Sequence, residues 1–341
     1  MHRCLELASR GRGRVGNGAL VGAVLARGGK VLAEAFHALY GGPHAERALL
    51  EAYKTSIQAE DILYVSLEPC CHHGKTPPCT DIIIERGIRT VVYGMHDPDP
   101  RVCGQGVEIL RKAGLRVIGP VERARCEYFN RGFMSVRRYS RPHVTFKMAL
   151  DRAGRISMDD GSPSKITSGE QDAWSHQMLR GRHDAILCGI GTVETDNPLL
   201  NIRFDQKGIL YLTEGLNENI NGNENFFEPY KIVLDPSGRI DPTVNVAALH
   251  PDRLILCIGE GVGERRASAL SLLHRQGVRI CRLPLQNGVF AWNALWRALI
   301  EPDEQFHGIT SILVEGGRRT WDAFRSAGMV DEEVILIGAA S

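Results

Sequence analysis

Residues 43–79 carry the pattern that most constrains how this chain can fold. The stretch begins with PHAE at 43–46 and ends with EPCCHHGKTPPC at 68–79. One imidazole and two thiolates form a ligand set with which zinc keeps its fourth position open for water. Such a set requires segments far apart in the chain to meet around one ion. We predict that the zinc ligands are His44, Cys70 and Cys79.

Glu46 follows the first of these ligands by two positions, where a zinc deaminase has its proton carrier. In such a site the glutamate does not bind the metal, but moves a proton from the attacking water to the leaving amine. The run HAERALLEAY predicts a helix over 44–53, so both residues lie at its first turn. Cys79 begins another predicted helix, where the backbone dipole favours a thiolate. The sequence therefore predicts hydrolytic deamination with Glu46 as the catalytic residue.

Two other interpretations of this pattern remain open. Cys71, His72 or His73 could supply a fourth ligand and close the site, which would make it a non-catalytic structural zinc module. A deaminase acting on a nucleoside or an RNA base is the second alternative. It would leave the long insert between the two cysteine ligands, and the whole second half of the chain, without a purpose.

The run at 68–79 resembles the deaminase signature of the RibD family of bifunctional riboflavin-biosynthesis proteins. The resemblance covers most of residues 1–120 and includes VGAV at 21–24, GGPHAE at 41–46, MHDPDP from Met95 and GQG at 104–106. It implies zinc-dependent deamination of a phosphoribosylamino-pyrimidine, followed by NADPH-dependent reduction of its ribose to ribityl. By matching position it also implies substrate contacts for Asn17, His37, Lys75 and Thr76. A lysine suits the phosphate of such a substrate as a point-charge partner.

The composition is that of a globular protein, and the resemblance implies a phosphorylated small molecule as its substrate. Of the 341 residues 43% are apolar and 24% charged, and the net charge of +1 gives no reason to expect nucleic acid or a membrane as partner. We found no apolar run of membrane-spanning length, and the opening MHRCLE does not resemble a signal peptide. The nine cysteines show no framework spacing, so free thiols in a cytoplasmic protein are expected.

Alternating strand and helix patterns predict two α/β domains, residues 1–140 and 141–341, separated by a turn-prone basic break at 135–142. In the first domain we expect a mainly parallel sheet with helices on both faces, as in the three-layer cytidine-deaminase-like fold. Its predicted strands are 19–26, 30–36, 61–67, 90–93 and 115–118, and its predicted helices are 2–10, 44–53, one from 77 and 104–113.

The strand and helix patterns predict a second α/β domain, and the family resemblance implies that it is dihydrofolate-reductase-like. Its predicted strands are 144–150, 184–188, 230–234, 252–258, 278–282 and 309–314, and its predicted helices are 169–180, 262–276, 290–300 and 319–327. GIGTV at 189–193 and EGGRR at 315–319 each follow a strand, where glycines let a phosphate approach the backbone. Neither is a G-x-G-x-x-G run, so a Rossmann fold is not supported.

The family resemblance implies reductase contacts as well. For the substrate it implies Arg180, Leu200, Arg203 and Glu315, and for NADPH it implies Ala149, Lys165, Thr192, Asp196, Gly316 and Gly317. A guanidinium suits a phosphate through its planar fork of donors, although salt bridging is the ordinary alternative for both arginines.

Several positions depart from the family pattern. Ala153 replaces an acid, and Pro163 and Lys165 stand where Ser-x-Trp is usual. The run VILIGAAS at 334–341 ends where the family has further strands, so we expect an uncovered sheet edge unless a partner, such as a second copy in a homo-oligomer, pairs with it. A deaminase with a degenerate, non-catalytic reductase domain is therefore an alternative function.

Overall fold

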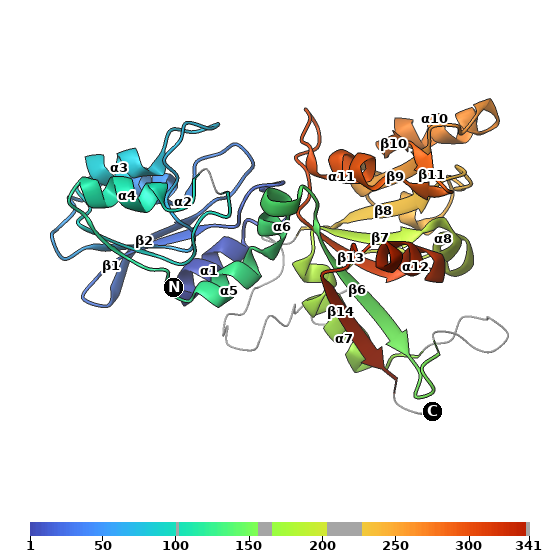
Figure 1. Cartoon of the computed structure of the whole chain (residues 1–341), viewed down its shortest axis with the longest axis horizontal. Helices are drawn as coiled ribbons and strands as arrows, with labels where there is room; N and C mark the ends of the chain where they lie inside the picture. The colour runs from blue at the N-terminus through green and yellow to red at the C-terminus, as the bar shows by residue number, and fades with distance from the viewer. Residues whose placement is uncertain (100–101, 156–165, 203–226, 339–341) are drawn as a thin grey trace. The chain divides into compact units, whose positions relative to one another are not determined.

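The structure, a computed structural model, describes residues 1–99, 102–155, 166–202 and 227–338 (Figure 1). The chain divides into two compact units. The first comprises Met1–Arg141 together with Pro302–Gly308, and the second comprises Pro142–Glu301 and Ile309–Ser341. The chain thus returns to the first unit over Pro302–Gly308, a segment that lies inside the contiguous second domain expected from the sequence. None of the described helices combines the length and apolar composition of a membrane span.

The first unit has a five-stranded sheet in the order β2-β1-β3-β4-β5. Its strands are β1 (Gly22–Arg27), β2 (Lys30–Phe36), β3 (Ile62–Val65), β4 (Thr90–Tyr93) and β5 (Arg116–Ile118). The strands β3, β4 and β5 are parallel, but β1 is antiparallel to both of its neighbours. The predicted mainly parallel sheet is therefore mixed. The turn between β1 and β2 explains the difference, because Gly28 and Gly29 have φ of 56° and 79°, as a tight hairpin turn requires.

The helices of the first unit are α1 (His2–Ser9), α2 (Ala45–Ala52), α3 (Cys79–Glu85), α4 (Gln105–Lys112), α5 (Arg123–Phe129) and α6 (Arg131–Tyr139). The first four were predicted, whereas α5 and α6 were not. The boundary between the units, at Arg141 and Pro142, falls inside the expected break at 135–142. The first half of this stretch is helical rather than a turn, since α6 continues to Tyr139. This basic stretch is helical because Phe133 and Val136 are buried on one face. The helix ends at Ser140, which has φ of 53°.

The second unit has a seven-stranded sheet in the order β10-β9-β8-β7-β13-β6-β14, with parallel pairing throughout. Its strands are β6 (His143–Leu150), β7 (Ala185–Gly189), β8 (Tyr230–Asp235), β9 (Leu254–Gly259), β10 (Arg279–Leu283), β13 (Ser311–Gly316) and β14 (Glu332–Ile337). A small hairpin joins β11 (Leu285–Gln286) to β12 (Val289–Phe290). The outer strand β14 exposes Ile335 and Ile337. The α/β class predicted for both units is confirmed.

The helices of this unit are α7 (Gly169–Met178), α8 (Ile190–Asp196), α9 (Asn245–Ala248), α10 (Ala267–Arg275), α11 (Trp292–Ile300) and α12 (Arg318–Ser326). The near-continuous apolar runs of β7 and β9 are buried along almost their whole length, as expected for parallel strands covered on both faces. Two connections position the candidate reductase residues. The strand β7 leads directly into α8, and β13 leads into α12 (Figure 1).

Candidate active site

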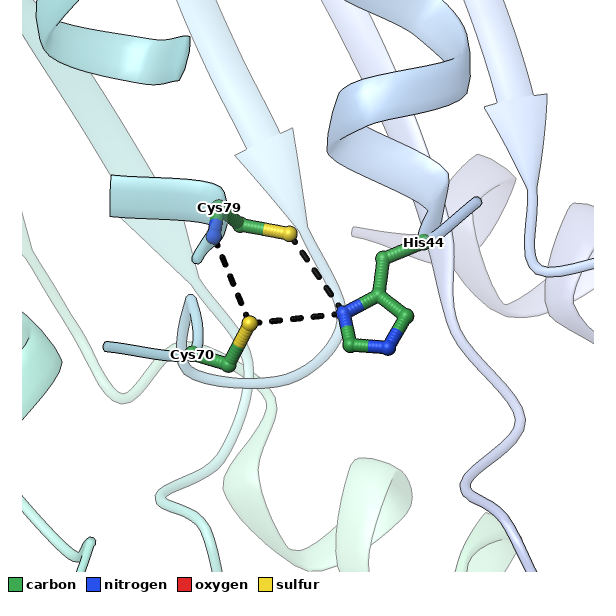
Figure 2. A group of neighbouring side chains, drawn as sticks. All are labelled: His44, Cys70 and Cys79. Carbon is green, nitrogen blue, oxygen red and sulfur yellow. Dashed lines mark hydrogen bonds between the residues drawn. The ribbon is translucent and has the colours of Figure 1, made fainter. Parts of the chain in front are cut away.

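The structure brings His44, Cys70 and Cys79 into one group. Their ligand atoms all lie within 4.8 Å of one another, and no other His, Cys, Asp or Glu of the described residues belongs to the group. The Nδ1 atom of His44 lies 3.3 Å from Sγ of Cys70 and 3.5 Å from Sγ of Cys79. Figure 2 shows the imidazole and the two thiols pointing toward a common centre. Cys71, His72 and His73, considered above as fourth ligands, are not members of the group.

Two helix starts and one loop position these side chains. His44 is the N-cap of α2, with extended backbone, so the helix begins one residue later than predicted. Cys79 is the first residue of α3. Cys70 lies in the loop after β3, and its sulfur accepts the backbone N–H of Cys79 at 3.3 Å. This N–H is one of the donors that a helix start leaves without an intrahelical partner, so the start of α3 holds both sulfurs together.

The donor set and its spacing fit a zinc ion. With typical bond lengths of about 2.3 Å to sulfur and about 2.0 Å to nitrogen, tetrahedral coordination separates N and S donors by about 3.5 Å. The two N–S distances in the group, 3.3 and 3.5 Å, are close to this value. Three protein donors of this kind are typical of a hydrolytic zinc site rather than a structural one.

The charges of the group are coupled. Hydrogen bonding with Cys79 and His44 lowers the pKa of Cys70 well below that of a free thiol, whereas the hydrogen bond with Cys70 and burial raise the pKa of Cys79. Burial raises the pKa of Glu46 to about 7. Glu46 is only 3% exposed and forms a hydrogen bond with the Cys79 side chain. The predicted proton carrier therefore lies beside the ligand group without joining it.

A cavity of about 280 Å³ opens next to the group, and His44, Glu46 and Cys70 line it. The four residues expected to contact the substrate in this unit line the same cavity. They are Asn17, His37, Lys75 and Thr76. The hydroxyl of Thr76 is buried without a hydrogen-bond partner among the described residues, so a ligand in the cavity would satisfy it.

His37 is fixed within this wall. Its Nδ1 lies 3.0 Å from the carbonyl oxygen of Pro43, and its ring meets that of His44 edge-on with centroids 5.4 Å apart. Burial lowers the pKa of His37, which favours the neutral imidazole. A neutral ring whose Nδ1 donates to a carbonyl can accept a hydrogen bond at Nε2.

Sequence reasoning gave no role to three residues at this cavity. The buried carboxylate of Glu68 accepts the backbone N–H groups of Gly104 and Val107 at 3.0 and 3.3 Å, and it also binds His96 Nδ1 and the N–H of Asp97. It thereby holds the segment that carries Asp97, which lines the cavity together with Arg137. The signal was present, since Glu68 begins the EPCC run and MHDPDP contains Asp97.

In the second unit the structure places Arg180 and Glu315 together. The guanidinium donates from Nε to Oε1 at 2.7 Å and from Nη2 to Oε2 at 2.5 Å, while Nη1 donates to the carbonyl of Asn201 at 2.7 Å. Burial alone would raise the pKa of Glu315, but Arg180 outweighs it and lowers this pKa to about 2. Leu200, another expected substrate contact, is buried in the same core cluster as Val193 and has φ of 47°.

Three of the expected cofactor residues, Thr192, Gly316 and Gly317, meet where the adjacent strands β7 and β13 end. A Cβ atom added to Gly316 would lie 2.9 Å from Thr192, and Gly317 has φ of 86°, so both glycines are required where the β13 turn meets α8. Ala149 lies near the same end of the neighbouring strand β6. Asp196 is the exposed last residue of α8. Lys165 and Arg203 lie outside the described residues, as does Pro163.

A second cavity of about 670 Å³ lies where β8 and β9 end. It is lined by Ser237, by the glycine-rich turn after β9, and by Arg265 and Arg266. Two guanidinium groups beside a glycine-rich turn suit an anionic ligand such as a phosphate. This site was not predicted from the sequence, because its residues belong to turns without a recognised motif.

Comparisons with known proteins agree with this division of the chain. Residues 1–95 match the family described as cytidine and deoxycytidylate deaminase zinc-binding region, and residues 142–340 match the RibD C-terminal domain. The riboflavin biosynthesis protein RibD of Escherichia coli is 31% identical over 99% of this chain and 86% of that protein. The Actinobacillus pleuropneumoniae RibD is 40% identical, but this alignment spans 60% of the chain and only about half, 54%, of the relative.

Solved structures show the same likeness. Acinetobacter baumannii RibD, form 1, matches with a TM-score of 0.76 and 28% identity, covering 100% of this chain and 86% of that one. A Thermotoga maritima protein described as diaminohydroxyphosphoribosylaminopyrimidine deaminase/5-amino-6-(5-phosphoribosylamino)uracil reductase matches with a TM-score of 0.74 and 33% identity. That match covers 96% of this chain and 82% of the Thermotoga chain.

Proposed function

Because this chain belongs to the RibD family of riboflavin biosynthesis proteins, we propose that it carries out two consecutive reactions on a phosphorylated pyrimidine. The first unit deaminates the ring of a diamino-hydroxy-phosphoribosylamino-pyrimidine with zinc, and the second reduces the ribose of the product to ribityl with NADPH. The observation that carries the proposal is the group of one imidazole and two sulfurs, with buried Glu46 beside it, at the wall of a cavity.

In the deamination, the three ligand side chains hold the ion and Glu46 moves protons. Zinc, when bound, supplies a water that is activated for attack near neutral pH. Glu46 accepts a proton from that water and delivers a proton to the ring amine, which leaves as ammonia. Its pKa of about 7, raised by burial, makes both the acid and the base form accessible at neutral pH. Binding of a cation beside it would lower this pKa and favour the base form at the start of the cycle.

The cavity wall holds the substrate in place. Asn17 and His37 are suited to hydrogen bonds with the pyrimidine, because an amide and a neutral imidazole both donate and accept. Lys75 and Thr76 are suited to the phosphate. Thr76 offers a buried hydroxyl that has no hydrogen-bond partner among the described residues, and Lys75 offers a positive charge at the cavity wall.

For the reduction, the second unit offers two places for an anionic dinucleotide. The turn at Gly316 and Gly317 packs on Thr192, and the cavity with Arg265 and Arg266 lies at the end of neighbouring strands. NADPH, when bound, supplies the hydride. The ion pair with Glu315 occupies two donors of Arg180, Nε and Nη2, along one edge of its guanidinium. Phosphate binding by Arg180 therefore stays a prediction. Phosphate binding by Arg203, a homo-oligomeric state and a cytoplasmic location also stay predictions.

The proposal is tested by assaying both half-reactions on one preparation supplied with zinc and NADPH. We expect ammonia release from the diamino substrate and oxidation of NADPH with the deaminated product. In Glu46→Gln we expect a loss of deamination by about 10²-fold or more with one zinc retained and NADPH oxidation unchanged. Normal deamination by this variant would exclude the proposed role of Glu46. Deamination without NADPH oxidation would favour a degenerate reductase domain.

A further inference from the structure

Tyr40 joins the cavity of the first unit to the segment Pro302–Gly308. The ammonium of Lys75 lies 3.7 Å from the centroid of the Tyr40 ring. The same ring is stacked on that of His307, with centroids 4.4 Å apart and an angle of 18° between their planes. Tyr40 and Lys75 both line the cavity. A side chain encoded far downstream therefore packs against the ring that contacts a cavity lysine.

His307 is held in this place by its backbone. Its carbonyl oxygen accepts the N–H of Asn17 at 2.8 Å. A Cβ atom added to Gly16 would lie 2.2 Å from that oxygen, and Gly16 has φ of 57°, so only glycine permits the close approach. The preceding turn is rigid, because the Asp303 carboxylate accepts the N–H groups of two residues of the turn, the second of which, Phe306, is 2% exposed.

We propose that Tyr40 and His307 are positioning residues for deamination, which hold Lys75 over the cavity for the substrate phosphate. This inference rests on the proposed function, in which Lys75 binds that phosphate. Through its carbonyl, His307 also fixes the backbone of Asn17, the proposed contact for the pyrimidine. The segment from the second half of the chain thus supports residues suited to both ends of the substrate.

The physical reason is the flexibility of lysine. A lysine side chain loses considerable rotamer entropy when it is fixed on a ligand. Over the Tyr40 ring, the ammonium is attracted by the π face, and the stem of Lys75 passes Gly41, where an added Cβ atom would lie 3.4 Å from its Cδ. A lysine that is already confined loses less freedom when a phosphate arrives, so the substrate binds more tightly.

The test compares the phosphorylated substrate with its dephosphorylated riboside in zinc-loaded full-length protein. For Tyr40→Leu we expect the preference in kcat/KM for the phosphorylated form to fall about two- to fivefold, through a higher KM with little change in kcat. Tyr40→Phe keeps the ring and should keep the preference. His307→Ala should also reduce the preference for the phosphorylated substrate. Tyr128→Leu is a matched control, because this exposed tyrosine also has a cation, Arg131, 4.5 Å from its ring centroid.

A double variant separates positioning from general damage. Once Lys75→Met has removed the ammonium, Tyr40→Leu should cause no further loss of phosphate preference. Equal losses with both substrates, or a Tyr40→Phe variant as poor as Tyr40→Leu, would overturn the inference. Failure of the wild-type protein to deaminate would refute the proposed function instead. In that case, calorimetric binding of ribose 5-phosphate by the same variants still decides whether Tyr40 and His307 position Lys75.

Discussion

Arg180 gives the sharpest distinction between a structural role and a substrate-binding role. The sequence resemblance implies that it binds the substrate phosphate, but the structure pairs it with Glu315 in a buried, two-point ion pair. Replacing Arg180 by Met keeps the length of the side chain and leaves the Glu315 carboxylate buried without its partner. We therefore expect the main effect of Arg180→Met to be a lower free energy of unfolding of the second unit, rather than the loss of a substrate contact.

The magnitude follows from two independent considerations. The depression of the Glu315 pKa from 4.5 to about 2 corresponds to roughly 3 kcal/mol of stabilisation. Breaking a buried ion pair by removing one partner typically costs about 3–5 kcal/mol. With a urea dependence of about 2 kcal/mol per molar, the unfolding midpoint of the second unit should fall by about 1.5–2.5 M. The double variant Arg180→Met/Glu315→Leu removes both charges and should recover much of this loss.

Tryptophan fluorescence provides the assay, since the four tryptophans of the chain all belong to the second unit. They are Trp174, Trp292, Trp296 and Trp321. Their signal therefore follows unfolding of this unit. The wild-type protein should lose the ion-pair stabilisation as the pH falls from 4.5 toward 2, because the folded pKa of Glu315 lies below its unfolded value. Glu315→Leu should lack this component of the acid sensitivity.

An Arg180→Met variant with the wild-type urea midpoint would refute the reasoning. If that variant also raised KM for the deaminated substrate, with little change in kcat, the phosphate-binding role would replace the structural one. A double variant as unstable as the single one would show that the loss does not come from the unpaired Glu315 charge.

Two further changes test the first unit. Cys70→Ser should lose zinc on dialysis and lose deamination, as measured by metal analysis and ammonia release. Cys71→Ser should keep both the zinc and the activity. Zinc loss from the Cys71 variant would mean that the ligand group is wrongly assigned. Glu68→Gln places an amide against backbone donors and should cost about 1–3 kcal/mol locally, seen as faster hydrogen exchange at the amides of Gly104 and Val107. Unchanged exchange there would contradict the role of Glu68.

Sequence reasoning succeeded where the chemistry is local. A histidine at a helix start, a glutamate two residues later and a cysteine at the next helix start each have a specific short-range reason, and the structure brings these residues together. The parallel strands of the second unit were also predictable, because buried parallel strands are continuously apolar. The bounds of β6, β7, β8, β9, β10 and β13 differ from the expected ones by only a few residues. The outer strand β14 was not predicted, and its burial alternates along the strand instead of being continuous.

Prediction from the sequence failed where a tertiary contact or a turn determines the local structure. The turn at Gly28 and Gly29 makes β1 antiparallel to β2, and its glycines were not recognised as a hairpin signal. The helix α6 was missed because its arginines suggested a linker, although Phe133 and Val136 form a buried face. Pro302–Gly308 could not be assigned to the first unit, because its contacts, such as that between Tyr40 and His307, join residues 267 positions apart.

Lys75 and Arg180 show why charged residues are the hardest to assign from a sequence. Both matched a phosphate contact by position, and both are suited to phosphate by chemistry. In the fold, Lys75 contacts a neutral ring at a cavity wall and keeps its charge available to a ligand. Arg180 instead meets a carboxylate 135 positions away that takes up its charge. The role of a cation thus depends on whether the fold supplies its anion, and a short motif does not contain that information.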